Sequence, residues 1–109
     1  MTKETVYITS ATRTAVGSLN KTLKNIPASE LGSSVMSETI KKSKLKKNEI
    51  DEVIMGQVLT GATGQNPARQ AAISSGIAKE IPAYIVNRVY GSWIRSVALG
   101  LHSIVSGES

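Results

Sequence analysis

The residues whose types and spacing could support covalent chemistry lie between positions 83 and 106. A strand-like apolar run, residues 83–86, leads into a short turn, and an apolar-periodic helix over about residues 91–106 leaves it. Tyr90 falls in this turn, where a side chain would stand above the end of a sheet and at the helix N-terminus. Free N–H groups and the positive end of the helix dipole stabilise developing negative charge there. The spacing therefore predicts a nucleophile elbow suited to acyl transfer.

Tyr90, the residue at the crest of this predicted elbow, is a poor nucleophile for acyl transfer. A phenol has a pKa near 10, against about 8.5 for a thiol, so roughly one phenol in a thousand is ionised at neutral pH. The chain has no cysteine, which also excludes disulfides and thiolate–metal sites. Its single histidine, His102, falls on the last predicted helix and is expected at the surface. No carboxylate pair, metal-ligand spacing or phosphate-binding motif accompanies Tyr90.

Five ordered blocks of the sequence resemble the opening part of thiolases of the acetyl-CoA acetyltransferase type. They are YITSATRTAVGS (7–18), PASELG (27–32), IDEVIMGQVL (50–59), GQNPARQAA (64–72) and NRVYGSWIRSVALG (87–100). The blocks cover most of the chain, so residues 1–109 are identified as a partial thiolase N-terminal domain. The resemblance implies an incomplete α/β/α layer fold.

The resemblance also implies roles for the elbow residues. Tyr90 occupies the position of the family's acyl-accepting cysteine, and Trp93 replaces a family glycine on the same turn. The phenolic oxygen would reach beyond the place of the thiolate sulfur, so oxyanion donors would no longer match the reacting carbon. We expect Tyr90 to be non-functional, as a packed or pocket-blocking side chain. The activating histidine and second cysteine of the family belong to motifs further downstream.

The expected function is therefore that of a thiolase-family fragment without catalysis of its own. The family condenses and cleaves acyl-CoA, so the resemblance implies coenzyme A thioesters as partners; no cofactor is expected. The alternative is an assembly module that pairs with itself or with a thiolase subunit through an edge strand. The candidate interface residues are Ala83, Tyr84, Ile85, Val86 and Asn87. An active acyltransferase is a third hypothesis, supported only by the family resemblance.

Strands alternate with helices along the chain, which predicts an α/β fold with three strands and about three helices. The predicted strands cover residues 6–11, 52–58 and 83–87, and the predicted helices cover about 29–42, 67–75 and 91–106. Ser29 and Asn66 are candidate N-caps, and Pro67 suits the first helical position. A buried stripe is predicted on the last helix from Ile94, Val97, Ala98, Leu101, Ile104 and Val105.

Two expectations concern how these elements fit together. In the family the first strand is separated from the second by two strands that this sequence lacks. We therefore expect either a rearranged three-stranded sheet or a marginal, aggregation-prone product. Arg69, next to Asn66 and Gln70 in a family block near the dimer contact, is predicted to tie two loops together.

The net charge of +5 has a local source. Five lysines close the first predicted helix: Lys41, Lys42, Lys44, Lys46 and Lys47. Cations at a helix C-terminus favourably face the dipole, and no aromatic residue is interleaved to stack bases, so we expect a solvated helix end and no nucleic-acid partner. No apolar run reaches the ~20 residues of a membrane span, and no signal peptide is expected. A cytoplasmic location is the expectation for this cysteine-free chain.

Overall fold

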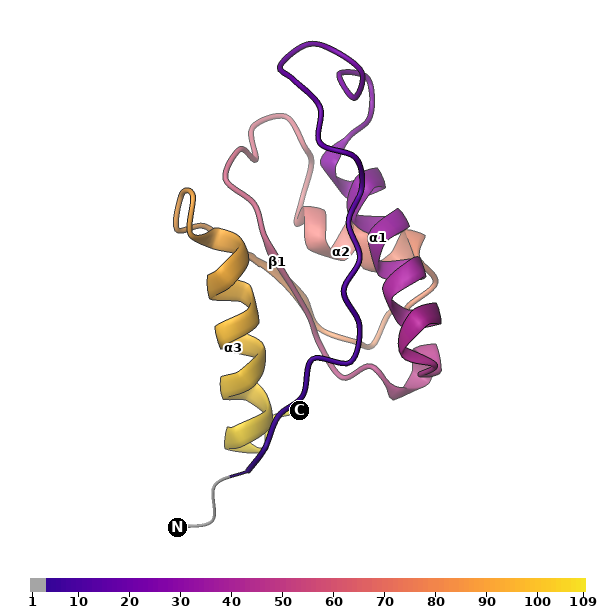
Figure 1. Ribbon diagram of the computed structural model, residues 1–109, viewed down its shortest axis with the longest axis vertical. Helices are drawn as coiled ribbons and strands as arrows, with labels where there is room; N and C mark the ends of the chain where they lie inside the picture. Colours follow the sequence, from indigo (N-terminus) through magenta and orange to yellow (C-terminus); the bar gives the residue numbers. More distant parts are fainter. Residues whose placement is uncertain (1–3) are drawn as a thin grey trace.

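The computed structural model describes residues 4–109, which form three α-helices, one short 3₁₀ helix and two β-strands (Figure 1). In chain order they are α1 (Ala28–Ser43), η1 (Lys47–Glu49), β1 (Val53–Gly56), α2 (Pro67–Ser74), β2 (Ala83–Val86) and α3 (Ser92–Ser106). The two later strands and all three helices lie where the sequence predicts them, with ends that differ by at most two residues.

The two strands form a parallel sheet with helices on both faces. Val53 of β1 lies opposite Ala83 of β2, and Gly56 lies opposite Val86. Parallel neighbours need a crossover connection, and α2 lies within it. Helices α1 and α2 pack together, with α2 against both strands, while α3 packs mainly on β1 from the other side (Figure 1). The predicted α/β layer fold is confirmed.

The buried core is small and aliphatic, as a chain without phenylalanine predicts. Its cluster consists of Val53, Ala72 and Ile77. Met36 of α1 and Met55 of β1 pack against this cluster and remain partly buried. Because methionine is flexible, these two side chains can fill an irregular space between the layers. The core therefore lies between the sheet and the α1–α2 layer, rather than on both sides of the sheet.

Helices α1 and α2 approach each other closely because small residues line their contact. Ala68 and Ala71 of α2 are fully buried. On α1, a Cβ added at Gly32 would lie 3.2 Å from the Cβ of Ala71 and 3.0 Å from the Cε of Met55. Such distances are at the limit of contact, so the α1–α2 contact has no room for larger side chains.

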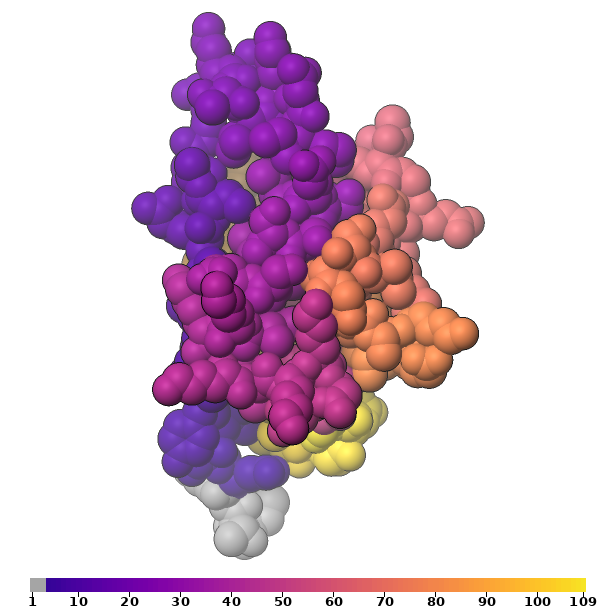
Figure 2. All heavy atoms as spheres, turned by 90° about the vertical axis from the view of Figure 1, so that its right-hand side faces the viewer, coloured from indigo at the N-terminus to yellow at the C-terminus, as the bar shows by residue number. Residues whose placement is uncertain are grey.

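The strand predicted at residues 6–11 is wrong: this segment is extended but pairs with no strand, so residues 4–109 contain two strands rather than three. Tyr7 and Ile8 are 77% and 79% exposed. The segment runs beside α1, in indigo in Figure 2, and does not reach the free edge of β1. Its β-branched composition suits a strand, but a strand also needs a neighbour within about 5 Å.

The buried stripe predicted on α3 is also wrong. Ile94, Val97, Leu101 and Val105 are between 44% and 56% exposed. The buried residues of α3 are instead two small polar ones, Ser92 and Ser103. Among residues 4–109, no helix is long and apolar enough to cross a membrane. The apolar stripe of α3 therefore faces solvent on the side of the helix that is turned away from the sheet.

One hydrogen bond and one close backbone contact explain which face of α3 is turned inward. Near its end, the Ser103 hydroxyl donates a 2.7 Å hydrogen bond to the Glu52 carboxylate just before β1. At its start, the backbone of Ser92 lies against Gly56 of β1, where an added Cβ would be 2.6 Å from the Ser92 carbonyl carbon. A helix fixed at both ends cannot rotate to bury its apolar stripe.

The predicted helix caps are partly confirmed. Asn66 adopts a left-handed conformation and its side chain accepts a hydrogen bond from the Arg69 N–H at 3.1 Å, with Pro67 at the first helical position. Ser29 is not an N-cap: α1 already begins at Ala28, and Pro27 occupies the cap position without a side-chain hydrogen bond. Because Pro27 has no N–H and its ring fixes φ, which is −60° here, the N-terminus of α1 has one fewer backbone N–H group that needs a hydrogen-bond acceptor.

Candidate active-site elbow

The turn between β2 and α3 is a tight strand–turn–helix elbow held mainly by Ser92. Its hydroxyl accepts a 2.9 Å hydrogen bond from the Arg88 N–H and donates a 2.6 Å hydrogen bond to the Val89 carbonyl. Asn87 adds a second clamp, because its side-chain oxygen accepts from the Val89 N–H at 2.9 Å. The backbone on both sides of Tyr90 is therefore fixed, and the predicted elbow is present.

The clamped turn holds Val89 in an unfavourable backbone conformation. Its φ is +52°, in the left-handed region where β-branched side chains are rare. Such strain costs of order 1–3 kcal/mol and persists only where the surroundings impose it. The hydrogen bonds of the Ser92 and Asn87 side chains to the Val89 backbone hold Val89 in this conformation.

We expect Val89→Gly to stabilise the protein by about 1 kcal/mol, because glycine adopts a positive φ without strain and this gain exceeds its entropic cost. Val58→Gly is the matched control: Val58 has no positive φ, so the same replacement there should lower stability. Urea denaturation of the three proteins checks both signs. Equal destabilisation at the two positions would contradict strain at Val89.

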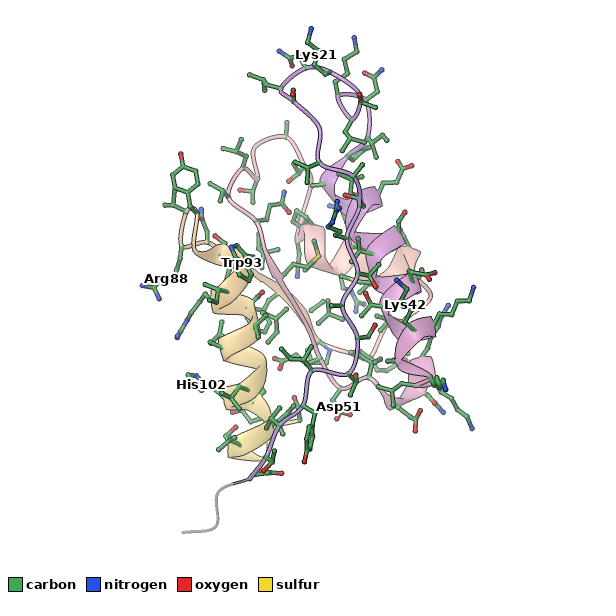
Figure 3. All side chains as sticks on the ribbon, viewed as in Figure 1. Lys21, Lys42, Asp51, Arg88, Trp93 and His102 are labelled. Atoms are coloured by element: carbon green, nitrogen blue, oxygen red, sulfur yellow. The ribbon has the colours of Figure 1, made fainter. Side chains whose placement is uncertain are left out.

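The crest residue points away from the protein. Tyr90 is 92% exposed, so it is neither packed nor buried in a pocket, and that part of the prediction is wrong. Trp93 lies in the first turn of α3 and is 67% exposed (Figure 3). It lines a groove beside β1. The elbow therefore presents a phenol to solvent with its helix N-terminus open.

Among residues 4–109, the single histidine lies far from this crest. His102 is exposed, as predicted, and lies ten residues into α3, roughly 15 Å of helix rise from Ser92 (Figure 3). No side chain caps the N-terminus of α3. Within residues 4–109, no three histidine or acidic side chains gather as metal ligands. The elbow alone can orient a side chain and favour negative charge, but it cannot deprotonate a phenol.

One tyrosine on the strand that leads into the elbow has a shifted pKa. Partial burial raises the pKa of the Tyr84 hydroxyl on β2, the carboxylates of Glu52 and Glu108 add to the rise, and Arg95 opposes it. Tyr84 therefore stays protonated well above neutral pH. It contributes packing to the α3 side of the sheet and no base.

The loops below the elbow are tied by two residues of the fourth sequence block. The Arg69 guanidinium donates hydrogen bonds to the carbonyls of Lys79 and Ile81 at 2.6 and 3.3 Å, which confirms its predicted role as a tie. The Gln70 side-chain amide donates to the carbonyls of Thr63 and Gln65 at 2.8 and 2.9 Å. These bonds fix the connections before and after α2, and so position β2 and the elbow.

Sequence reasoning missed two residues that shape the elbow, Ser92 and Gly56. A serine two residues beyond the predicted crest is a common turn-forming residue, and this position could have signalled a hydroxyl clamp. A glycine inside a predicted strand often marks close backbone approach, and Gly56 is such a glycine. Both residues determine where α3 begins.

A parallel α/β sheet that leads through a tight elbow into a helix is a scaffold on which acyl-transferring enzymes present a nucleophile. The family profile described as "Thiolase, N-terminal domain" matches residues 6–109. The chain therefore belongs to the thiolase family.

Individual relatives agree with this assignment. An acetyl-CoA acetyltransferase of Cupriavidus necator is 46% identical over 104 residues, covering 95% of this chain and 26% of its own length. A cytosolic acetyl-CoA acetyltransferase of Mus musculus is 42% identical over 104 residues, with 95% of this chain and 26% of its own length covered. The crystal structure of the Acat5 thiolase of Ascaris suum with coenzyme A superposes with a TM-score of 0.90 at 40% identity, over 93% of this chain and 26% of that one. This chain thus spans about a quarter of the length of these relatives.

Proposed function

We propose that this chain is a scaffold part of a thiolase, one that folds the N-terminal elbow but performs no acyl transfer on its own. Tyr90 is the observation that carries the proposal. It stands at the crest, fully accessible, where the family resemblance places an acyl-accepting cysteine. Coenzyme A thioesters are the proposed substrate class of the assembled protein, since a structural neighbour holds coenzyme A. A cytoplasmic location, which suits a cysteine-free chain, belongs to the same proposal.

Two physical features support the lack of activity. A phenol is a weak nucleophile until a base activates it, and the single histidine of the chain, His102, lies ten residues along α3 from Ser92. The exposed position of Tyr90 also keeps water around its oxygen, so the helix N-terminus stabilises an oxyanion there less than in a dry site. Nucleophilic attack on a thioester therefore lacks activation, positioning and desolvation.

The proposal predicts that neither the natural chain nor its Tyr90→Cys variant cleaves acetoacetyl-CoA. A cysteine would restore the nucleophile but not the base that activates it, since His102 lies too far along α3. Loss of the acetoacetyl-CoA enolate absorbance in the presence of coenzyme A measures the reaction. The acetyl-CoA acetyltransferase of Cupriavidus necator serves as the positive control. Turnover by either form of the isolated chain would overturn the proposal.

A second candidate function is assembly through the outer edge of β2. The Ala83 carbonyl on this edge is occupied by the Asn66 side-chain amide at 2.8 Å. The neighbouring Ile85 belongs to the side of β2 that faces away from β1, because the flanking Pro82 and Val86 carbonyls bond to β1. Its backbone groups could pair with a second copy. Sedimentation of the natural chain and of Ile85→Pro tests this: a dimer that only the variant loses favours assembly here.

A further inference from the structure

The most strongly charged part of the surface lies where α1 ends. Residues 41–49 contain five lysines and one glutamate, a net charge of +4, which is most of the +5 carried by the whole chain. All five lysines are exposed: Lys41, Lys42, Lys44, Lys46 and Lys47. These five lysines together with Leu45 are named the lysine turn. The segment forms a continuous part of the face shown in Figure 2, in magenta.

Hydrogen bonds hold the backbone of the lysine turn in one shape. Helix α1 ends at Ser43, whose hydroxyl donates to the Ile40 carbonyl at 2.7 Å and accepts from the Leu45 N–H at 3.3 Å. Lys44 is left-handed, with a φ of 60°, and its N–H donates to the Lys41 carbonyl at 3.2 Å. The chain then enters η1. The lysines are therefore carried by an ordered turn, so binding through them loses little backbone entropy.

The one acidic residue of this segment is engaged with the backbone. The Glu49 carboxylate accepts a 2.6 Å hydrogen bond from the N–H of Lys46, at the start of η1. The Lys47 side chain lies over the end of α2, where a Cβ added at Gly76 would be 2.6 Å from its Nζ. Glu49 therefore stabilises the backbone of the lysine turn, and the lysines remain at the surface around it.

An apolar side chain is exposed among these charges. Leu45 lies between Lys44 and Lys46 and is 44% exposed. Residues 41–49 contain neither arginine, whose planar fork suits bidentate phosphate recognition, nor an aromatic residue on which a base could stack. Lysine is instead a flexible point charge. The combination fits a diffuse negative surface with an apolar layer beneath it, rather than a discrete phosphate or a nucleic acid.

We propose that the lysine turn is a peripheral docking site for an anionic lipid membrane. The lysines adsorb to the negative headgroup layer, and Leu45 enters the boundary between headgroups and acyl chains. The cytoplasmic leaflet of a cell membrane carries the required negative charge. Lys42 lies on the opposite side of the molecule from Arg88 of the elbow (Figure 3), so this site is separate from the elbow and does not depend on the proposed function.

Co-sedimentation of the natural chain with lipid vesicles tests the proposal without any variant. Phosphatidylcholine vesicles that contain about 30% phosphatidylserine should bind the chain at least about tenfold more tightly than vesicles of phosphatidylcholine alone. Binding should weaken at least about tenfold between about 50 and about 500 mM salt, because salt screens the attraction. Equal binding to the two kinds of vesicle, or binding that salt leaves unchanged, would overturn the proposal.

Two pairs of lysine replacements locate the binding surface. Lys42→Gln combined with Lys46→Gln should weaken binding to the anionic vesicles about 25-fold, since each lysine near such a surface contributes about fivefold. The matched control, Lys21→Gln combined with Lys24→Gln, removes the same charge from the exposed loop before α1 (Figure 3). It should weaken binding less than about threefold, because that loop lies beyond the Debye length from the bound surface. Equal losses for the two pairs would overturn the assignment to the lysine turn.

Leu45→Asn separates a membrane from other polyanions, because it removes the apolar contact and leaves the charge unchanged. It should weaken binding to the anionic vesicles about fivefold. Duplex DNA of random sequence, at equal phosphate concentration and salt, should bind the natural chain more weakly than the vesicles and should not respond to Leu45→Asn. Tighter binding to the DNA, or vesicle binding that Leu45→Asn leaves unchanged, would overturn the proposal of a membrane partner.

Discussion

Gly56→Ala is expected to destabilise the protein by about 3 kcal/mol or more, or to prevent folding of the elbow, because overpacking against backbone cannot be relieved by side-chain rotation. The added Cβ would lie 2.6 Å from the Ser92 carbonyl carbon, 2.7 Å from its oxygen and 2.7 Å from the Trp93 nitrogen. All three atoms belong to the first turn of α3. To accept the methyl group, α3 would have to move off β1 and break the Ser92 clamp on the turn.

Gly100→Ala is the matched control for this replacement. Gly100 lies in the interior of α3, and an added Cβ there meets no atom within 4 Å. Alanine should therefore raise stability by about 1 kcal/mol through helix propensity alone. Urea denaturation followed by far-UV circular dichroism measures both variants. If Gly56→Ala were as stable as Gly100→Ala, the close contact between β1 and the start of α3 would be refuted.

Ala71→Leu is expected to have the second largest effect, a loss of about 3 kcal/mol, because a fully packed contact cannot hold the extra carbons. Ala71 has no exposed surface and faces Gly32 of α1. A leucine would push α1 from α2 and open the cluster of Val53, Ala72 and Ile77 below them. Thermal unfolding should show a lower midpoint and a broader transition.

Ser74→Leu places the same side chain on the same helix at an exposed position. Its effect should stay within about 0.5 kcal/mol, as for most surface replacements. The pair separates loss of packing from any general effect of leucine on α2. Equal stability of the two variants would show that the α1–α2 contact can expand, contrary to the distances at Gly32.

The parts of the fold that depend on local sequence could be predicted. The Asn66–Pro67 helix start follows from a side chain that caps its own turn, and the strand–turn–helix order around Tyr90 follows from a change in apolar periodicity. The Arg69 tie came from the family resemblance and is confirmed by its bonds to Lys79 and Ile81. Each of these features is set by residues that are close in the sequence or by a motif.

The failed predictions concern partners distant in the sequence. Residues 6–11 have the composition of a strand, but composition does not show whether a neighbour lies within hydrogen-bonding distance. The apolar stripe of α3 was assigned to the core because apolar faces are usually buried. In the structure, α3 is instead held by the buried residues Ser92 and Ser103, and Ser103 donates a hydrogen bond to Glu52. Contacts made by small polar residues cannot be predicted from the spacing of apolar residues.

The candidate site illustrates the same division. The position of Tyr90 on the elbow could be predicted, whereas its exposure of 92% could not, because exposure depends on what covers the turn. The strain at Val89 and the Ser92 clamp also depend on three-dimensional contacts across the turn. Sequence thus predicts where chemistry would occur, and the structure shows which groups could support it.

The most direct test of the account is mass spectrometry of the purified chain after incubation with acetyl-CoA, because it reports on the crest residue itself. Tyr7, which is 77% exposed on the N-terminal segment, provides the internal reference for a tyrosine outside the elbow. The account predicts no acetyl ester on Tyr90 above the level found on Tyr7. Selective acetylation of Tyr90, formed at neutral pH and released by coenzyme A, would contradict it.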